Sequence, residues 1–428
     1  MAHEENKPQA MSPEDQLVMI DGDTTKLLEQ WSMRNIQLRK DRDIINIIKL
    51  PAKTDEVKWY TNEPKVFFDT SRALVSLYPP RFRLPIDINC SPEQKAKMNK
   101  GERLAVGIYR TLDNRSAEQG GVSWLWDLAY WVLLGWWAVF DIVEKDIEGN
   151  TVFRADIWDP INVYPEWDEF GLKKCIRTYT VDKESAERMA SQFQQKGLEF
   201  IYHEPPEGQS CNVVNYWLRT SDKNGKPKIW NAITLNGILV KPMTLQKNLK
   251  RIPVHIGAVG SPDRVSENWQ ERYGESIIYA NRDMYGYRNA MITLMATITA
   301  ETAYPNLVMN LQNPNAPSVK GEDIKGYGSQ IRMKLGETIN LLKHAATPAE
   351  VAGLMSWVGQ KAQEASLPAT VYGSVPFELS GFAISQYMAT LKYKLGQHLN
   401  AMQFILSRIM TDFLYQYQHG NFKDITLT

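Results

Sequence analysis

The stretch from Ser366 to Ser385, SLPATVYGSVPFELSGFAIS, separates two segments with helical patterns. Before it, Pro348–Ala365 places apolar residues at helical spacing and has no Gly/Pro cluster in its interior. After it, Ile384–Gln418 repeats leucine, isoleucine and methionine on the same period. The stretch itself is rich in Gly, Pro and Ser, which are typical of loops. We therefore expect a flexible, weakly charged loop between two long helices. Such a loop suits a mobile contact with a partner better than it suits the pocket of an enzyme.

The composition limits the classes of partner. The chain has 428 residues, enough for two or three domains, and equal numbers of basic and acidic residues, 49 each. A protein that holds nucleic acid statically usually carries a basic excess, so any contact with DNA is expected to be local or weak. The cysteines Cys90, Cys175 and Cys211 lie far apart, which predicts no disulfide framework and favours a reducing compartment. The polar first residues predict no signal peptide.

The most apolar segment is Val122–Val143, VSWLWDLAYWVLLGWWAVFDIV. Asp127 interrupts it and Asp141 closes it, and the uninterrupted run between them is shorter than the roughly 20 residues that span a bilayer. We interpret the segment as a buried helix, with a membrane anchor as the alternative.

The patterns along the chain predict an α+β fold. Residues 1–25 are expected to be a disordered arm. From Asp141, short β-rich runs alternate with turn signals such as Asn236-Gly237, which predicts an antiparallel sheet. Helical patterns precede and follow this region, and a Gly- and Pro-rich insert with short strands is expected at Tyr304–Ala346. The other expected helices are Lys26–Lys40, Lys58–Tyr78, Ser91–Ser116, Ser123–Phe140, Lys183–Lys196 and Gly274–Thr302.

Motifs for catalysis are missing from the sequence. It contains no phosphate-binding Gly-x-x-x-x-Gly-Lys-Ser/Thr, no dinucleotide fingerprint and no nucleophile elbow, and its histidines lack metal-ligand spacing. We therefore predict no enzyme activity, no cofactor and no metal. One set of acidic residues could instead form a divalent-ion site. We favour the interpretation that these residues lie in a solvated strand–turn–strand. The members of the set are Asp156, Asp159, Glu166, Asp168 and Glu169.

Basic residues in the C-terminal part of the chain are sparse, but their positions are suggestive. Two interpretations are open: solvated faces or ion pairs between subunits, and contacts with DNA. The candidates are Arg282, Arg288, Lys320, Lys325, Arg332, Lys334, Lys392 and Lys394.

The order of these segments resembles the portal proteins of tailed bacteriophages over most of the chain. The features that match are DPINVYPEWDEFG (Asp159–Gly171), RIPVHIGAVGSPD (Arg251–Asp263) leading into the helix at Gly274, the helix-flanked insert, and the opening stretch. The last of these carries the small-residue pattern Pro368, Gly373, Ser380, Gly381 and Ala383.

The resemblance implies a portal-like domain order. A wing of helices and sheet would occupy residues 26–266, and only ten residues follow Gln418, so the crown is expected to be short or absent, with 419–428 as its start or a truncated tail. The remaining parts would be a stem helix at 267–303, a clip at 304–346, a second stem helix at 347–365, a tunnel loop at 366–383 and a long helix returning to the wing at 384–418.

The resemblance also implies a function. Portal proteins form a ring, expected to be a dodecamer, at one capsid vertex, and the ring surrounds the channel for DNA packaging and ejection. The implied partners are double-stranded DNA, the major capsid protein, the large terminase that hydrolyses ATP, and head-completion or tail proteins, with no membrane. The protein would assemble in the host cytoplasm and reside in the virion. The loop residues expected to line the channel are Ser366, Pro368, Thr370, Tyr372, Gly373, Ser374 and Pro376.

Two other hypotheses stay open. The first is a metal-dependent nucleic-acid-processing enzyme with an unrecognised acidic site. The second is a membrane-associated scaffold anchored by Val122–Val143.

Overall fold

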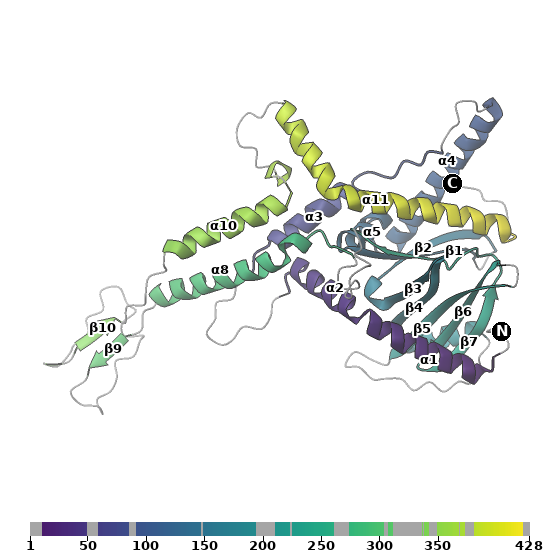
Figure 1. Ribbon diagram of the computed structural model, residues 1–428, viewed down its shortest axis with the longest axis horizontal. Helices are drawn as coiled ribbons and strands as arrows, with labels where there is room; N and C mark the ends of the chain where they lie inside the picture. Colours follow the sequence, from purple (N-terminus) through teal and green to yellow (C-terminus); the bar gives the residue numbers. More distant parts are fainter. Residues whose placement is uncertain are drawn as a thin grey trace. The chain divides into compact units, whose positions relative to one another are not determined.

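The computed structural model shows a mixed helix-and-sheet protein, which confirms the α+β class (Figure 1). The chain divides into two compact units. Unit 1 comprises Met1–Asn46, Lys65–Tyr279 and Leu367–Thr428, and unit 2 comprises Ile47–Pro64 and Ala280–Ser366. The structure describes residues 11–48, 59–84, 91–146, 149–193, 210–222, 225–260, 274–303, 307–310, 336, 338–341, 349–367, 369–372 and 381–422.

Unit 1 begins with two consecutive helices, α1 (Pro13–Gln30) and α2 (Ser32–Ile45). The prediction of disorder up to residue 25 is therefore wrong from Pro13 onward. Ser12 caps α1 by accepting a hydrogen bond from the Asp15 amide, and Pro13 occupies the first turn, where its missing N–H costs little. Ile20 and Leu27, two turns apart, are fully buried. The charged residues on the outer face of α1 made this narrow apolar stripe difficult to recognise in the sequence.

The larger sheet of unit 1 is an antiparallel meander, in the order β3-β4-β5-β6-β7. The expectation of an antiparallel region in the middle third of the chain is confirmed. Asn236 and Gly237 form the β6–β7 turn with φ of 45° and 77°, the left-handed conformation that Asn-Gly hairpins adopt. The strands are β3 (Val163–Asp168), β4 (Gly171–Asp182), β5 (Ser210–Ser221), β6 (Pro227–Leu235) and β7 (Ile238–Gln246), and helix α6 (Lys183–Gln192) follows β4.

The smaller sheet of unit 1 has β1 (Trp136–Lys145) at its centre, between β2 (Thr151–Trp158) and β8 (Val254–Ala258). All three strands are antiparallel to their neighbours. Residues on both faces of β1 are buried. Ala138 and Phe140 pack in one core cluster with residues of the larger sheet such as Trp217, and α5 (Trp124–Leu133) and α11 (Gly381–His419) also contact the strand. This accounts for the continuous run of apolar residues in its sequence.

The apolar segment Val122–Val143 is therefore part helix and part strand. A single helix over Ser123–Phe140 was expected, but α5 ends at Leu133 and β1 begins at Trp136. Gly135 makes the change of direction with φ of 94°. Periodicity could not separate the two elements, because both are apolar on every side. None of the helices in the described ranges is both long and apolar enough to cross a bilayer.

Within its described residues, unit 1 also contains α11 and two shorter helices named below. Of these, α11 and the second of the shorter helices match their predicted ranges closely. The longest, α11, directs a stripe of buried residues at the rest of the unit, including Leu395, Met402, Ile409 and Phe413. The others are α3 (Glu63–Ser76), whose first two residues belong to unit 2, and α4 (Pro92–Glu118).

Unit 2 is built on two packed helices, α8 (Arg282–Ala303) and α10 (Ala349–Ala365) (Figure 1). The two strands between them in sequence, β9 (Leu307–Asn310) and β10 (Thr338–Leu341), pair antiparallel. Most of the insert predicted at Tyr304–Ala346 lies outside the described residues.

The helix expected from Gly274 begins only at Arg282, after a short 3₁₀ turn at Tyr279–Asn281. Backbone hydrogen bonds explain the delay. The Glu275 amide donates to the Val259 carbonyl at 2.9 Å and the Ile277 amide donates to the Leu133 carbonyl at 2.8 Å, so these amides serve other strands and helices of unit 1.

The turn at Gly135 provides a test of the α5–β1 junction. A Cβ at this position would lie 2.7 Å from the Glu275 carbonyl carbon. At Gly237, also at positive φ, a Cβ would meet no atom within 4 Å. Gly237→Ala should cost roughly 1–2 kcal/mol from backbone strain alone, and Gly135→Ala should cost roughly 1–3 kcal/mol more from the steric overlap. Urea unfolding of both variants measures this difference, and equal losses would contradict the assigned packing.

Candidate functional site

The first residue predicted to line a channel, Ser366, is buried at the end of α10. Its side chain is 8% exposed, and its hydroxyl donates to the Ala362 carbonyl at 2.8 Å and accepts from Asn281 Nδ2 at 3.3 Å. Ser366 was expected to line a channel. Within the single chain, its hydroxyl connects the end of α10 to Asn281, which directly precedes α8 in unit 2.

The described part of the remaining stretch is a 3₁₀ turn, η4, formed by Ala369–Tyr372. It includes Thr370 and the half-buried Tyr372. Helix α11 starts at Gly381, three residues before the predicted start. Four of the predicted lining residues lie outside the described residues: Pro368, Gly373, Ser374 and Pro376.

Of the predicted basic residues, Arg288 has a clear structural role. It forms an ion pair with Glu63 inside unit 2. Arg282 opens α8, and Lys394 is half-buried on α11, where burial lowers the pKa of its ammonium group. Lys392 lies in α11. The other four, Lys320, Lys325, Arg332 and Lys334, are outside the described residues.

The acidic set near β3 does not converge on one point. Its carboxylates pair with separate cations: Asp156 with Arg154 at 2.9 Å, Glu166 with Lys173 at 3.4 Å, Asp159 with Arg42 at 3.6 Å, and Asp168 with Arg219. Within the described ranges, one group of His, Cys, Asp and Glu side chains is close enough to share an ion, and it contains none of the residues of this set.

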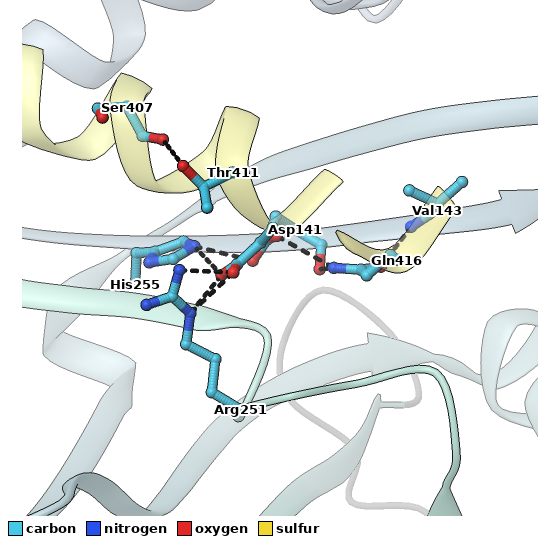
Figure 2. A network of polar contacts seen from close by, with 8 residues as sticks. Asp141, Val143, Arg251, His255, Ser407, Thr411 and Gln416 are labelled. Atoms are coloured by element: carbon cyan, nitrogen blue, oxygen red, sulfur yellow. Dashed lines mark hydrogen bonds and ion pairs between the residues drawn. The ribbon is translucent and has the colours of Figure 1, made fainter. Parts of the chain in front are cut away.

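That group is a buried cluster of Asp141, His255 and Asp412, which we call the Asp–His–Asp cluster. The residues come from β1, β8 and α11. His255 Nε2 lies 3.1 Å from Asp141 Oδ1 and 3.1 Å from Asp412 Oδ2. The side chains of Asp141, His255 and Asp412 are 0%, 11% and 9% exposed. Figure 2 shows the Asp141 and His255 side chains directed toward each other from different strands.

Two further residues hold the carboxylates in place. Arg251 Nε donates to both Asp412 oxygens, at 2.8 and 2.6 Å. Gln416 Nε2 donates to Asp141 Oδ2 at 3.2 Å, and Gln416 Oε1 accepts from the Val143 amide at 2.8 Å (Figure 2). Each carboxylate therefore has one partner outside the three-residue cluster, and Gln416 also ties α11 to the backbone of β1.

Local sequence explains how these side chains meet. Asp412 and Gln416 are four residues apart on α11, so they lie on one face of the helix, together with buried Ile409 and Phe413. On the sheet, His255 of β8 is paired in register with Val139 of β1, two residues from Asp141. The alternation of side chains along β1 places Val139 and Asp141 on the same face.

The electrostatics of the cluster favour a proton on His255. Burial alone would lower the pKa of its imidazole, but the two adjacent carboxylates outweigh burial and raise this pKa to about 9. For Asp412, contacts with His255 and Arg251 outweigh burial and lower the pKa of the carboxyl group. Burial raises the pKa of Asp141, and His255 partly offsets this effect. Protonated His255 and Arg251 balance the two carboxylates in charge.

A groove of about 880 Å³ borders the cluster. His255, Asp412 and Arg251 contribute to its wall, together with aromatic side chains such as Phe404 and Tyr415. Scans against protein-family models and against curated proteins found no match for this chain. The cluster was missed in the sequence because its members are far apart in the chain. The available signals were the charge of Asp141 inside an apolar run and the polar pair Asp412 and Gln416 on an apolar stripe.

The raised pKa of His255 has a consequence for stability. Because the folded pKa of about 9 lies above the unfolded value of 6.5, the contribution of His255 is fully present below pH 6.5 and is lost as the pH rises through about 9. The full contribution is about 3 kcal/mol. Urea unfolding in EDTA between pH 6 and pH 10 should show this loss for the wild type.

The variant His255→Gln serves as the reference, because its amide is neutral throughout this pH range while other groups titrate unchanged. The difference in unfolding free energy between wild type and variant should shrink as the pH rises. A difference that is constant from pH 6 to pH 10 would show that His255 carries no proton in the folded state.

Proposed function

We propose that this chain is the portal protein of a tailed bacteriophage: a homo-oligomeric ring, expected to be a dodecamer, at a capsid vertex that forms the channel for DNA packaging and ejection. Its partners would be duplex DNA, the major capsid protein, the terminase motor and the head-completion proteins. The protein would assemble in the host cytoplasm and remain in the virion.

The observation that carries the proposal is the order of elements after the sheets. A sheet-rich region leads into helix α8, a two-stranded pair, helix α10, a short segment with a 3₁₀ turn, and the long helix α11. In the portal family, the corresponding order is wing, stem helix, clip, second stem helix, tunnel loop and long helix. The described elements fit this order without rearrangement, although β9 and β10 represent only part of the expected clip.

The helices of unit 2 also expose large apolar side chains. On α8, Tyr287 and Leu294 are 49% and 51% exposed, and on α10, Trp357 is 55% exposed. Exposed apolar side chains grouped on a small two-helix unit favour contacts with other chains. In a ring, neighbouring copies would cover these residues, so they support assembly through unit 2.

The charge balance fits a channel through which DNA slides. A wall with many phosphate-binding cations would hold the duplex in place, because each neutralised phosphate releases counterions and adds to the affinity. The chain has no net charge, and Arg288, one of the predicted DNA-facing residues, is paired with Glu63. Weak contacts from hydroxyl and small residues of the tunnel loop would let DNA move.

Ring assembly is directly testable. Light scattering and negative-stain images of the purified protein should show a large closed ring with a central pore. Trp357→Glu should weaken assembly, because it removes apolar surface from α10. Gln360→Glu adds the same charge one turn away on an exposed position of α10 and should stay closer to the wild type. A wild-type protein that remains monomeric or dimeric at every concentration would overturn the proposal.

The role of the tunnel loop calls for a separate test in a DNA-packaging reaction with assembled capsids and motor. Tyr372→Asp and Gly373→Trp should reduce packaging while leaving ring formation intact, because they place charge or bulk in the segment expected to face DNA. Tyr78→Asp makes the same substitution at a 77% exposed position after α3 and should package normally. Normal packaging by both loop variants would show that this segment does not contact DNA.

A further inference from the structure

The Asp–His–Asp cluster has the geometry of a metal site. One atom from each of Asp141, His255 and Asp412 lies within 4.8 Å of the other two, and the two distances from His255 Nε2 are 3.1 Å. Two ligands of one tetrahedral zinc ion, each bonded at about 2.0–2.1 Å, lie roughly 3.3 Å apart. The two distances from His255 Nε2 are close to that value.

A second observation is the contact geometry at the same place. Asp141 Oδ1 and His255 Nε2 are buried and face each other at 3.1 Å as an ion pair, but the angles at this contact do not meet those of a regular hydrogen bond. The Asp141 side chain is fully buried. Buried polar atoms are normally hydrogen-bonded, and an unsatisfied atom calls for an explanation such as an ion.

We propose that Asp141, His255 and Asp412 bind a divalent transition-metal ion, and that zinc is the ion this donor set suits best. One imidazole nitrogen and two carboxylate oxygens form a mixed N/O set, which is typical of zinc and unlike the all-oxygen sets of magnesium and calcium.

The surroundings fit this role. Gln416 and Arg251 donate to Asp141 and Asp412 and would orient the ligands, as outer-shell partners do in metal sites. The bordering groove of about 880 Å³ offers a route for the ion and room for water as a further ligand. Binding involves no redox step: the ion takes the position of the Nε2 proton, and that proton leaves to solvent.

The ion would act as a cross-link. It would join β1, β8 and α11. The two strands are also paired through their backbones, whereas α11 is attached at the cluster by side-chain contacts of these residues and Gln416. A metal bridge between three elements stabilises the folded state, because the unfolded chain does not bring the ligands together. This role is independent of the proposed portal function.

Titration calorimetry of EDTA-treated, dialysed full-length protein with zinc chloride tests the proposal. We expect one saturating site per chain, release of one proton per ion when two buffers of different ionisation enthalpy are compared, and no comparable binding of magnesium. His255→Gln and Asp141→Asn should each weaken zinc binding by at least about 100-fold, since loss of an outer-shell partner alone typically costs 10–100-fold. His419→Gln removes an exposed histidine of α11 and should bind like the wild type.

Cobalt provides an independent measurement on the wild type alone. Intense visible absorption bands at one equivalent of Co²⁺ are expected for a site of low coordination number, and zinc should abolish them. The proposal is overturned if wild-type protein binds no zinc under these conditions. It is also overturned if His255→Gln, shown to be folded by circular dichroism, binds zinc as tightly as the wild type.

Discussion

The attachment of α11 to β1 and β8 is the constraint on which unit 1 depends. Ionic groups are costly to bury, and a buried charge without a partner destabilises a fold by several kcal/mol. Asp141 is fully buried on β1, and its partners come from β8 and α11. Because no single element supplies both charges and partners, the helix, the inner strand and the edge strand are stable only together.

Apolar contacts also join β1, β2 and α11. Phe140, next to Asp141, stacks on Trp158 of β2 with ring centroids 4.9 Å apart, and Phe153 of β2 meets Phe413 of α11 edge to face at 5.3 Å. Non-polar area dominates the stabilisation here, whereas the polar cluster fixes the register of α11 along the sheet. A shift of the helix by one residue would separate Asp412 from both His255 and Arg251.

Periodicity predicted those elements that are exposed on one side. Helices α4, α10 and α11 fall close to their predicted ranges, and the meander lies in the region where an antiparallel sheet was expected. The prediction failed where the contrast between apolar and polar faces was weak: Val122–Val143 is almost entirely apolar, and α1 has many charged residues on its outer face. The Asp–His–Asp cluster was not predictable, because only tertiary contacts bring Asp141, His255 and Asp412 together.

The contacts that basic side chains make within the chain affect how strongly the protein would bind DNA. Arg34 is buried between the rings of Trp31 and Trp136, each 4.8 Å from its guanidinium, and donates to the carbonyls of Pro160 and Val163. Lys174 pairs with Asp23 at 2.7 Å. Positive charges in such contacts add little to the affinity of the protein for phosphate groups, because a carboxylate neutralises them or the surrounding protein buries them. In the proposed ring, these two cations would therefore add little to the affinity for duplex DNA.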